Sequence, residues 1–260
     1  MSGKIIALAN QKGGVGKTTT AVNLATAIAA VGKKVLLIDL DPQGNATTGF
    51  GIEQKDRKVT TYDVLIDGCS IKDAVLQTQI PNLDIIPATV ELSGAEDELL
   101  KESNKIFKLR GAMDEADAKE EWDFVLIDCP PSLSLMTLNA LAASDSVLVP
   151  LQCEFYALEG LSLLLKTIEK VRTTFNPDLH IHGILLTMYD KRNNLSAQVA
   201  SDVRGYLGNK VFDTVIPRNV RISEAPSHGK PSLLYDVGCQ GSQAYIQLAT
   251  EILKREKKAA

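Results

Sequence analysis

The segment Lys4-Ile-Ile-Ala-Leu-Ala9, followed by Asn10-Gln-Lys-Gly-Gly-Val-Gly-Lys-Thr-Thr-Thr20, decides the fold. The apolar run predicts a buried strand, and the glycines and hydroxyl residues after it predict a tight turn into a helix. Backbone N–H groups in such a turn can face phosphate oxygens, and the helix N-terminus adds positive charge. Lys17 can then reach the β- and γ-phosphates of a nucleotide, and Thr18 can offer its hydroxyl to Mg²⁺. The alternative is a glycine-rich turn that binds nothing.

Short apolar runs continue to alternate with longer amphipathic stretches along the rest of the chain. Strands are predicted at residues 4–9, 34–39, 83–87, 124–128, 146–150, 183–187 and 211–215. Helices are predicted at residues 18–31, 96–118, 135–143, 158–175, 195–207 and 242–257. Because most of the strands are apolar throughout, the pattern predicts an α/β fold with a doubly wound, mostly parallel sheet and helices on both faces. No long linker interrupts the chain, so we expect a single domain over residues 1–260.

Composition and charge exclude several classes of protein. The chain has 260 residues, of which 45% are hydrophobic and 23% are charged, and this excludes disordered and coiled-coil classes. No apolar run approaches the ~18 residues of a membrane-spanning helix. The 4 cysteines include no C-x-x-C pair, so we expect reduced thiols and a cytoplasmic location instead of a zinc site or disulfides. The net charge of −4 gives no general attraction to nucleic acid, which therefore requires a local basic patch.

Two further motifs end apolar strands with carboxylates. The first is Asp39-Leu-Asp41, and the second is Asp128, which ends the run at residues 124–127 in the form of a Walker B element. Ligands of doubly wound folds lie beyond the carboxyl ends of the strands, so these side chains are expected to meet metal, water or phosphate. We expect Asp128 to hold Mg²⁺ through a water molecule. For Asp39 and Asp41, the alternative is a turn residue that bonds its own backbone.

The phosphate loop departs from the common GxxxxGK[ST] pattern, because Gln11 replaces the first glycine and Lys12 adds a second lysine. This is the deviant Walker A pattern, and in it the chain resembles the ParA/MinD superfamily of ATPases. The resemblance implies that Lys12 crosses a dimer interface to touch the partner's ATP, that Asp41 orients the attacking water, and that Asp39 lies nearer the Mg²⁺ shell. An ammonium about 4 Å from a phosphate charge gains about 4 kcal/mol at an effective dielectric of about 20, before its desolvation cost. Dimerisation could therefore depend on the γ-phosphate, whereas an exposed loop lysine is the alternative.

Other blocks of the sequence resemble the partitioning branch of this superfamily, ParA/Soj. They lie at residues 41–46, 128–132, 150–160 and 216–229. The resemblance implies a chromosome- or plasmid-partitioning switch that forms a homodimer around Mg-ATP and then binds double-stranded DNA without sequence preference. A ParB-type partner would stimulate hydrolysis and release the protein from the nucleoid. The resemblance also puts Pro217, Arg218 and Asn219 beside the adenine.

These inferences give four sets of predicted site residues. The catalytic set is Lys12, Lys17 and Asp41. The ATP-binding set is Lys12, Gly13, Gly14, Val15, Gly16, Lys17, Thr18, Thr19, Pro217, Arg218 and Asn219. The Mg²⁺ set is Thr18, Asp39 and Asp128. The DNA-binding set is Lys191, Arg192, Arg218 and Arg221, which are clustered cations in two loops, with solvated loop arginines as the alternative.

Two other functions remain open on the sequence. A MinD-like membrane switch needs a basic amphipathic C-terminal anchor with bulky apolar residues, which the segment at residues 252–260 lacks, so no membrane partner is expected. A ligase of the dethiobiotin synthetase type would share the phosphate loop, but Lys12 and the partition-type blocks argue against it. We therefore expect an ATPase that converts ATP and water to ADP and phosphate, with ATP and Mg²⁺ as its cofactors.

Overall fold

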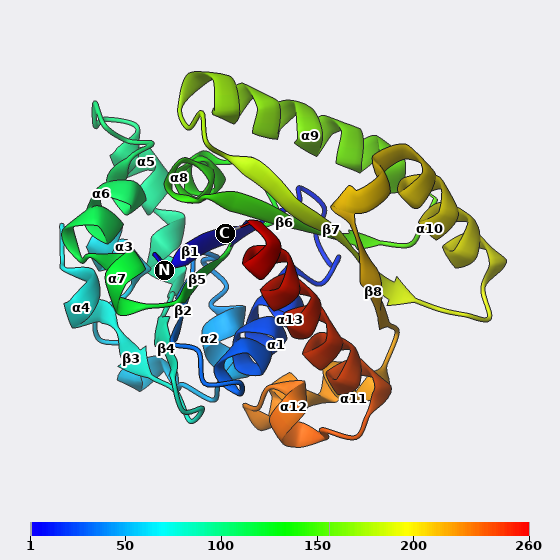
Figure 1. The fold of residues 1–260 in the computed structure, drawn as a ribbon. Coiled ribbons are helices and arrows are strands. Elements are labelled where there is room, and N and C mark those ends of the chain that lie inside the picture. Colours follow the sequence, from blue (N-terminus) through cyan, green and yellow to red (C-terminus); the bar gives the residue numbers. More distant parts are fainter. Residues whose placement is uncertain (1, 156, 260) are drawn as a thin grey trace.

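A computed structural model describes residues 2–155 and 157–259; residues 1, 156 and 260 of the predicted single domain lie outside the described ranges. Within those ranges the chain forms an eight-stranded sheet of order β3-β4-β2-β5-β1-β6-β7-β8 (Figure 1). The strands are β1 (Lys4–Leu8), β2 (Val35–Asp39), β3 (Leu76–Gln77), β4 (Leu83–Ile86), β5 (Phe124–Asp128), β6 (Ser146–Gln152), β7 (His180–Tyr189) and β8 (Val211–Pro217). The short edge strand β3, which the sequence did not predict, runs antiparallel to β4, and the other pairs are parallel. The predicted fold class is confirmed.

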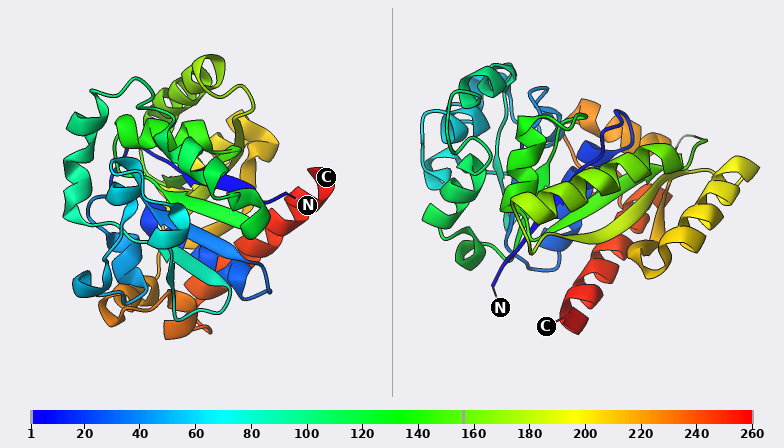
Figure 2. Two further views of the ribbon diagram at one scale, coloured as in Figure 1. Left: turned by 90° about the vertical axis from the view of Figure 1, so that its left-hand side faces the viewer. Right: turned by 90° about the horizontal axis from the view of Figure 1, so that it is seen from above.

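Helices cover both faces of the sheet, with α1 and α13 on one face and α8 and α9 on the other (Figure 2). The α-helices are α1 (Lys17–Ala29), α2 (Asn45–Gly49), α3 (Thr61–Leu65), α4 (Ile71–Ala74), α5 (Ala95–Leu99), α6 (Lys108–Glu115), α7 (Ala118–Glu121), α8 (Leu135–Ala143), α9 (Ala157–Thr174), α10 (Asn194–Leu207), α11 (Val220–Glu224), α12 (Ser232–Tyr235) and α13 (Gln240–Ala259). Short 3₁₀ turns are η1 (Gln54–Asp56), η2 (Val90–Ser93), η3 (Gly208–Lys210) and η4 (Ala225–His228). Among the helices described, none is both long and apolar enough to cross a membrane.

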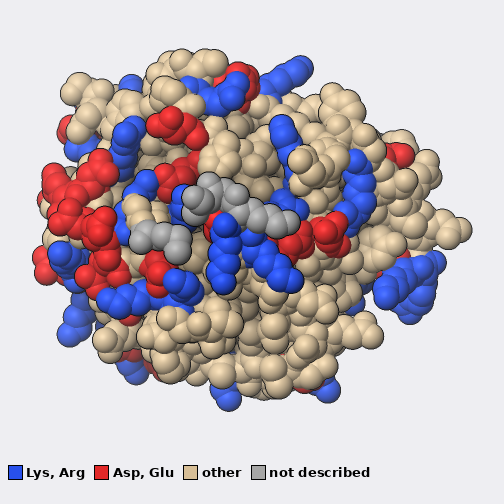
Figure 3. All heavy atoms as spheres, in the orientation of Figure 1, with Lys and Arg blue, Asp and Glu red and all other residues tan. Residues whose placement is uncertain are grey.

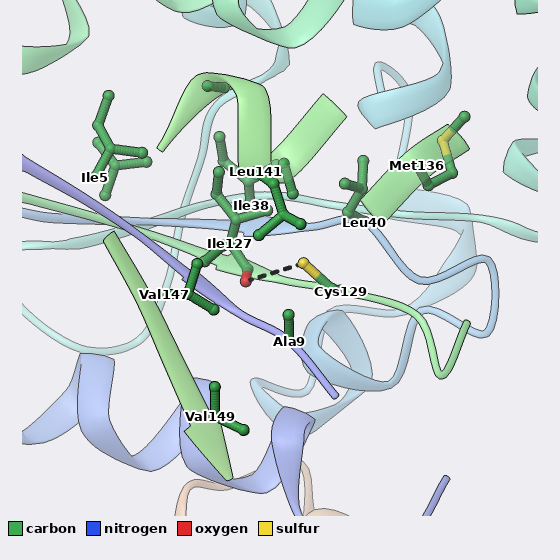
Figure 4. Packing of buried hydrophobic residues seen from close by; sticks show 14 of the residues in the cluster. Ile5, Ala9, Ile38, Leu40, Ile127, Cys129, Met136, Leu141, Val147 and Val149 are labelled. Carbon is green, nitrogen blue, oxygen red and sulfur yellow. Dashed lines mark hydrogen bonds between the residues drawn. The ribbon is translucent and has the colours of Figure 1, made fainter. Parts of the chain in front are cut away.

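The side chains of the central strands divide between two hydrophobic cores. Ile6 and Leu8 of β1 pack in the core that includes α1 and α13, whereas Ile5 and Ala7 pack in the core that includes α8 and α9. Figure 4 shows part of the second core around Ile127 of β5. Successive side chains of a strand point to opposite faces, so a strand between two helical layers is buried on both sides and is apolar except at its functional end. This is why every residue of β2 and β5 is buried.

One predicted helix is wrong, because residues 96–118 contain two short helices, α5 and α6, and only the first residue of α7. After α5, Leu100 is exposed, and the chain turns before α6 begins at Lys108. Asn139 of α8 holds this break: its Nδ2 donates to the Lys105 carbonyl at 2.7 Å, and its Oδ1 accepts from the Leu109 N–H at 3.3 Å. A long-range hydrogen bond thus replaces the local helical one, and the charged pattern of the segment could not show this.

The strand order puts β1 between β5 and β6, at the point where the order of the sheet reverses. Crevices at such a point, beyond the carboxyl ends of the strands, are the ligand sites of doubly wound folds. The phosphate loop follows β1, and the neighbouring strands β2 and β5 end in register at Asp39 and Asp128. The three motifs that are separate in the sequence therefore meet at one edge of the sheet.

Candidate functional site

The loop at residues 10–16 connects β1 to α1 and is fixed by the ends of two other strands. The Asn10 side chain donates to the Pro150 carbonyl of β6 at 2.7 Å and accepts from the Lys12 N–H at 3.0 Å. The Thr187 hydroxyl of β7 donates to the Val15 carbonyl at 2.8 Å. These contacts hold the loop in one conformation before any ligand arrives.

The first turn of α1 leaves its backbone N–H groups available. Gly16 is the N-cap residue, with φ 89°, and Gly14 has φ 74°; L side chains rarely adopt this region. No side chain caps the helix, so the unpaired N–H groups and the positive end of the helix dipole can bind an anion. This arrangement is that of a phosphate site.

Lys17 lies at the start of α1 and is buried, with 6% of its surface exposed. Its ammonium donates to the Lys12 carbonyl at 3.0 Å. Burial lowers the pKa of Lys17, and the nearby Asp128, Cys129 and Asp41 oppose this shift. An ammonium that is withdrawn from water in this way is stabilised by further negative charge, which a bound phosphate can supply.

Asp128 is fully buried at the end of β5, and neither of its carboxylate oxygens makes a well-formed hydrogen bond to a described residue. Burial and the neighbouring Asp39 raise its pKa well above the usual range, and Thr18 and Lys17 oppose the shift only in part. Buried polar groups without partners are rare in folded proteins. Asp128 therefore has the properties of a group that is completed by a cation.

Asp39 is also fully buried, but its oxygens are in use. Its Oδ2 accepts from the N–H and the hydroxyl of Thr47, at 2.8 and 2.6 Å, and its Oδ1 accepts from the Asp41 N–H at 3.3 Å. Burial raises its pKa to about 6. The geometry thus favours Asp39 as the anchor of the loop between β2 and α2, and its assignment to the Mg²⁺ shell stays a prediction.

Asp41 lies on that loop and is 8% exposed. Its Oδ1 accepts from the Gln43 N–H at 3.0 Å, which is the turn arrangement considered as the alternative. The other carboxylate oxygen has no hydrogen-bond partner among the described residues. Asp41 can therefore stabilise its turn and still accept a hydrogen bond from water.

Within the described residues, no three His, Cys, Asp or Glu side chains converge into a group that could hold a metal ion. A hard divalent cation at Asp128 would need a hydroxyl, water and phosphate oxygens to complete its shell. Thr18 is beside Asp128 and can supply the hydroxyl. The donor set fits Mg²⁺ that arrives with a nucleotide better than a resident metal ion.

Lys12 lies at the surface, and its ammonium forms an ion pair with Glu154, in the loop between β6 and α9. Sequence reasoning did not single out Glu154, although it lies in the partition-type block at residues 150–160. A glutamate in such a block gives no sign of its partner, because the two residues are far apart in the sequence. In this structure Lys12 is therefore held within its own subunit.

A groove of about 260 Å³ begins at Thr18 and Thr19 and runs between α1, α2 and the segment at residues 222–232. Its walls include Thr48 of α2 and Pro226 of η4. The predicted adenine residues lie just before this segment and are not among the described residues that line the groove. These residues instead make hydrogen bonds to other segments. The Arg218 N–H donates to the Tyr189 carbonyl of β7 at 3.0 Å, and the Asn219 side chain caps α11. Sequence reasoning therefore missed the lining residues downstream of Asn219.

The predicted DNA-binding arginines are exposed and already paired. Arg192 forms two hydrogen bonds to the carboxylate of Asp190, at 2.9 and 3.1 Å, which lower the pKa of that carboxyl to about 2. Arg221 was predicted in a loop, but it lies in the short helix α11, which Asn219 caps. It pairs with Glu224 at 3.0 Å and with Asp236 at 3.6 Å. No such partner holds Lys191 or Arg218 among the described residues.

Charge is unevenly distributed over the face seen in Figure 3. Acidic side chains gather on the side of α6 and α7, and Lys and Arg are spread over the rest of that face. Helices α6 and α7 carry Asp114, Glu115, Glu120 and Glu121 beside three basic residues. A polyanion would be repelled from that side.

Comparison with known proteins gives the same answer as the motifs. The family model of an AAA domain matches residues 3–181. The chain is 58% identical to the chromosome partitioning protein ParA of Caulobacter vibrioides over 98% of this chain and 95% of that protein. It is 55% identical to the sporulation initiation inhibitor protein Soj of Bacillus subtilis over 96% of this chain and 98% of that protein.

Solved structures share the fold of this chain. Cobyrinic acid a,c-diamide synthase from Mycobacterium smegmatis, with bound ADP and magnesium, has a TM-score of 0.86 and 36% identity over 99% of this chain and 97% of that one. The cell division ATPase MinD of Pyrococcus furiosus has a TM-score of 0.81 and 30% identity over 97% and 99% of the two chains. Since the likeness covers nearly the whole sequence and includes the phosphate loop, the chain belongs to the ParA/Soj family of chromosome-partitioning ATPases.

Proposed function

We propose that this ATPase is a DNA-binding switch, which forms a homodimer around Mg-ATP, attaches to double-stranded DNA without sequence preference, and detaches after hydrolysis. A ParB-type centromere-binding protein would stimulate the hydrolysis. The observation that carries the nucleotide part of this proposal is the pair of buried charges, Lys17 and Asp128, beside a helix N-terminus with free N–H groups.

At the phosphates, Lys17 and the backbone of residues 13–19 bind the β- and γ-phosphoryl groups. Thr18 and Asp128 would hold Mg²⁺, which neutralises charge on the phosphates when it is bound. The unpartnered oxygen of Asp41 orients a water molecule toward the γ-phosphorus. Water attacks the phosphorus as the bond to ADP breaks, and the products are ADP and phosphate.

Lys12 makes the dimer depend on the nucleotide. Within one subunit its ammonium is paired with Glu154, and both side chains are partly exposed, so the pair is weak. A partner subunit that carries a triphosphate offers more negative charge than one carboxylate does. Lys12 would therefore exchange Glu154 for the partner's phosphates when the γ-phosphate is present, and return to Glu154 after its loss.

DNA binding would use the two basic loops, through Lys191, Arg192, Arg218 and Arg221. The ion pairs of Arg192 and Arg221 are exposed, so exchanging a carboxylate for a DNA phosphate has a small cost. Each neutralised phosphate contributes about −0.9 to the slope of log affinity against log salt. Pairing two subunits doubles the number of phosphates that are neutralised, so ATP can control attachment without changing the loops themselves.

The test is to incubate the protein with duplex DNA and, separately, with anionic liposomes, each in the presence of ATP or ADP. We expect retention on DNA with ATP only, and no retention on liposomes. Equal retention on DNA with both nucleotides would refute the switch. Retention on liposomes with ATP would support the second candidate, a membrane-bound switch like MinD, which the TM-score of 0.81 to a MinD structure keeps in view.

A further inference from the structure

The segments that follow α2 and η4, two elements that line the groove, meet through their backbones. Gly51 follows α2, and Gly229 follows η4; both have a left-handed backbone, with φ 75° and 60°. A Cβ atom on Gly229 would lie 2.7 Å from the Gly51 Cα, and one on Gly51 would lie 3.0 Å from the Gly229 carbonyl oxygen. The two chain segments are therefore so close that neither position has room for a side chain.

The side chain of Gln79, in the turn between β3 and β4, makes hydrogen bonds to both segments. Its amide nitrogen donates to the Phe50 carbonyl at 3.1 Å and to the Gly229 carbonyl at 2.9 Å. Gln79 is exposed, so it buries little apolar surface and contributes little to the stability of the fold. The bridge nevertheless joins the α2 wall of the groove to the η4 wall at their point of closest approach.

The α2 wall leads directly to Asp41. The Gly44 N–H at the start of α2 donates to the Asp41 carbonyl at 2.9 Å, and the Gln43 N–H donates to the Asp41 carboxylate. Arg57 fastens the same segment from the other side, because its guanidinium donates to Thr48, Ile52 and Ala88 at 2.8 to 2.9 Å. A segment that is held at so many points moves as a unit, so a shift at Gly51 reaches Asp41.

We propose that Gln79 is a positioning residue, which couples the nucleoside half of the ligand in the groove to the placement of Asp41 at the γ-phosphate. This inference rests on the proposed function. The groove begins at Thr18 and Thr19, so a nucleoside whose phosphates lie on the phosphate loop can extend into it. A nucleoside in this groove fixes η4, Gln79 transmits that position to Phe50 and Gly51, and α2 carries it to Asp41. Hydrolysis is thereby fastest when the nucleoside groove is filled.

The experiment compares Gln79→Ala with Gln77→Ala, a matched control on the same hairpin whose exposed side chain makes no hydrogen bond among the described residues. We expect Gln79→Ala to lower kcat for ATP by about threefold to tenfold with KM unchanged, because a misplaced catalytic group slows the chemical step. Gln77→Ala should match the wild type. An unchanged kcat in Gln79→Ala, or an equal loss in both variants, would overturn the coupling.

Hydrogen exchange gives a second readout that does not depend on turnover. Mg-ADP should slow exchange at residues 13–19 and at residues 45–51 in the wild type and in Gln77→Ala. In Gln79→Ala the protection of residues 45–51 should be lost while that of residues 13–19 persists. Persistence of both, or loss of both, contradicts the proposal. If the wild type does not hydrolyse ATP, the proposed function is wrong. The hydrogen-exchange result still tests, on its own, the coupling through the two Gln79 hydrogen bonds.

Discussion

The ends of β1, β2 and β5 and the two basic loops differ in how they hold charge. At the strand ends, Lys17 and Asp128 are buried, and neither carboxylate oxygen of Asp128 makes a well-formed hydrogen bond within the described part of the chain. Arg192, in the loop before α10, and Arg221, in the short helix α11, are exposed, and each is already paired with a carboxylate near it in the sequence. The first region is incomplete without a ligand, and the second is complete without one.

This difference has consequences for energy and for control. A buried charge without a partner is costly, so the ligand that satisfies it binds with large, specific effects. Exposed ion pairs contribute at most about 1 kcal/mol and weaken with salt, so their exchange for DNA phosphates is nearly neutral and reversible. A nucleotide can therefore act as an obligatory switch at the first region, and DNA as an easily released ligand at the second.

The largest effect should follow from Lys17→Ala, which removes the buried ammonium and leaves the phosphates without their main side-chain charge. We expect ATP affinity to fall by about 100-fold or more, the usual result of deleting one partner of a buried charged pair. Isothermal titration with ATP and Mg²⁺ measures this. Lys166→Ala, on the exposed face of α9, is the control and should bind ATP as the wild type does. Undiminished ATP affinity in Lys17→Ala would show that the buried ammonium is not needed for phosphate binding, and the contrast with the exposed arginines would fail.

Asp41→Ala should separate binding from chemistry. We expect the hydrolysis rate to fall by about 100-fold, while ATP affinity stays within about twofold, because the group contacts water and not the phosphate cradle. The ATP-bound dimer should then accumulate, which light scattering can detect. Wild-type turnover in this variant would exclude Asp41 from the reaction.

Asp128→Asn should have effects of opposite sign on stability and on Mg²⁺. Asparagine removes a carboxyl group whose ionised form is destabilised by burial, so the melting temperature of the nucleotide-free protein should rise, by about 2–4 °C for each kcal/mol gained. The benefit of Mg²⁺ for ATP binding should fall about tenfold, since a neutral amide is a weaker ligand. Calorimetry with and without Mg²⁺ tests both, and a lower melting temperature or a full Mg²⁺ effect would contradict the account of Asp128.

The same region predicts a dependence of stability on pH. Burial raises the pKa of Asp39 to about 6 in the folded protein from its ordinary value of 3.8, so the folded chain takes up a proton that the unfolded chain does not bind. The free energy of unfolding of the nucleotide-free protein should therefore rise as pH falls from about 7 toward about 5. Asp128→Asn should flatten this rise, because burial and the neighbouring Asp39 raise the pKa of Asp128 as well, so Asp128 contributes to the same pH dependence. Denaturant melts at several pH values measure the slope, and an increase with rising pH would contradict it.

The smallest effects should be in the basic loops. Arg192→Ala should weaken ATP-dependent DNA retention by only a few-fold, and should reduce the salt slope by about 0.9 for each DNA phosphate that is no longer neutralised. Asp190→Asn should do the opposite, because it frees Arg192 from its carboxylate. ATP-dependent dimerisation should be unchanged in both. Retention assays across a salt series would refute this surface if neither variant differs from the wild type.

The sequence predicted the parts of the site that depend on local pattern. The phosphate loop, the carboxylates at the ends of β2 and β5 and the seven long strands all follow from short runs of residue types, and strand order at the switch point then brings them together. Residues 96–118 were predicted wrongly because Asn139, far along the chain, breaks the helix. Glu154 and Gln79 could not be predicted either, because each matters only through a partner that the fold brings near. The assignment of Asp39 to the Mg²⁺ shell stays a prediction, and only the structure shows that its Oδ2 accepts two hydrogen bonds from Thr47.

The central claim is that the triphosphate draws Lys12 from Glu154 to a second subunit. The most direct measurement is a crystal structure of Asp41→Ala with Mg-ATP, in which slow hydrolysis preserves the nucleotide. The account predicts a dimer with Lys12 of each subunit against the phosphates of the other, Glu154 released, and Mg²⁺ between Thr18, Asp128 and the phosphates. A monomer, or a dimer in which Lys12 still pairs with Glu154 of its own subunit, would contradict it.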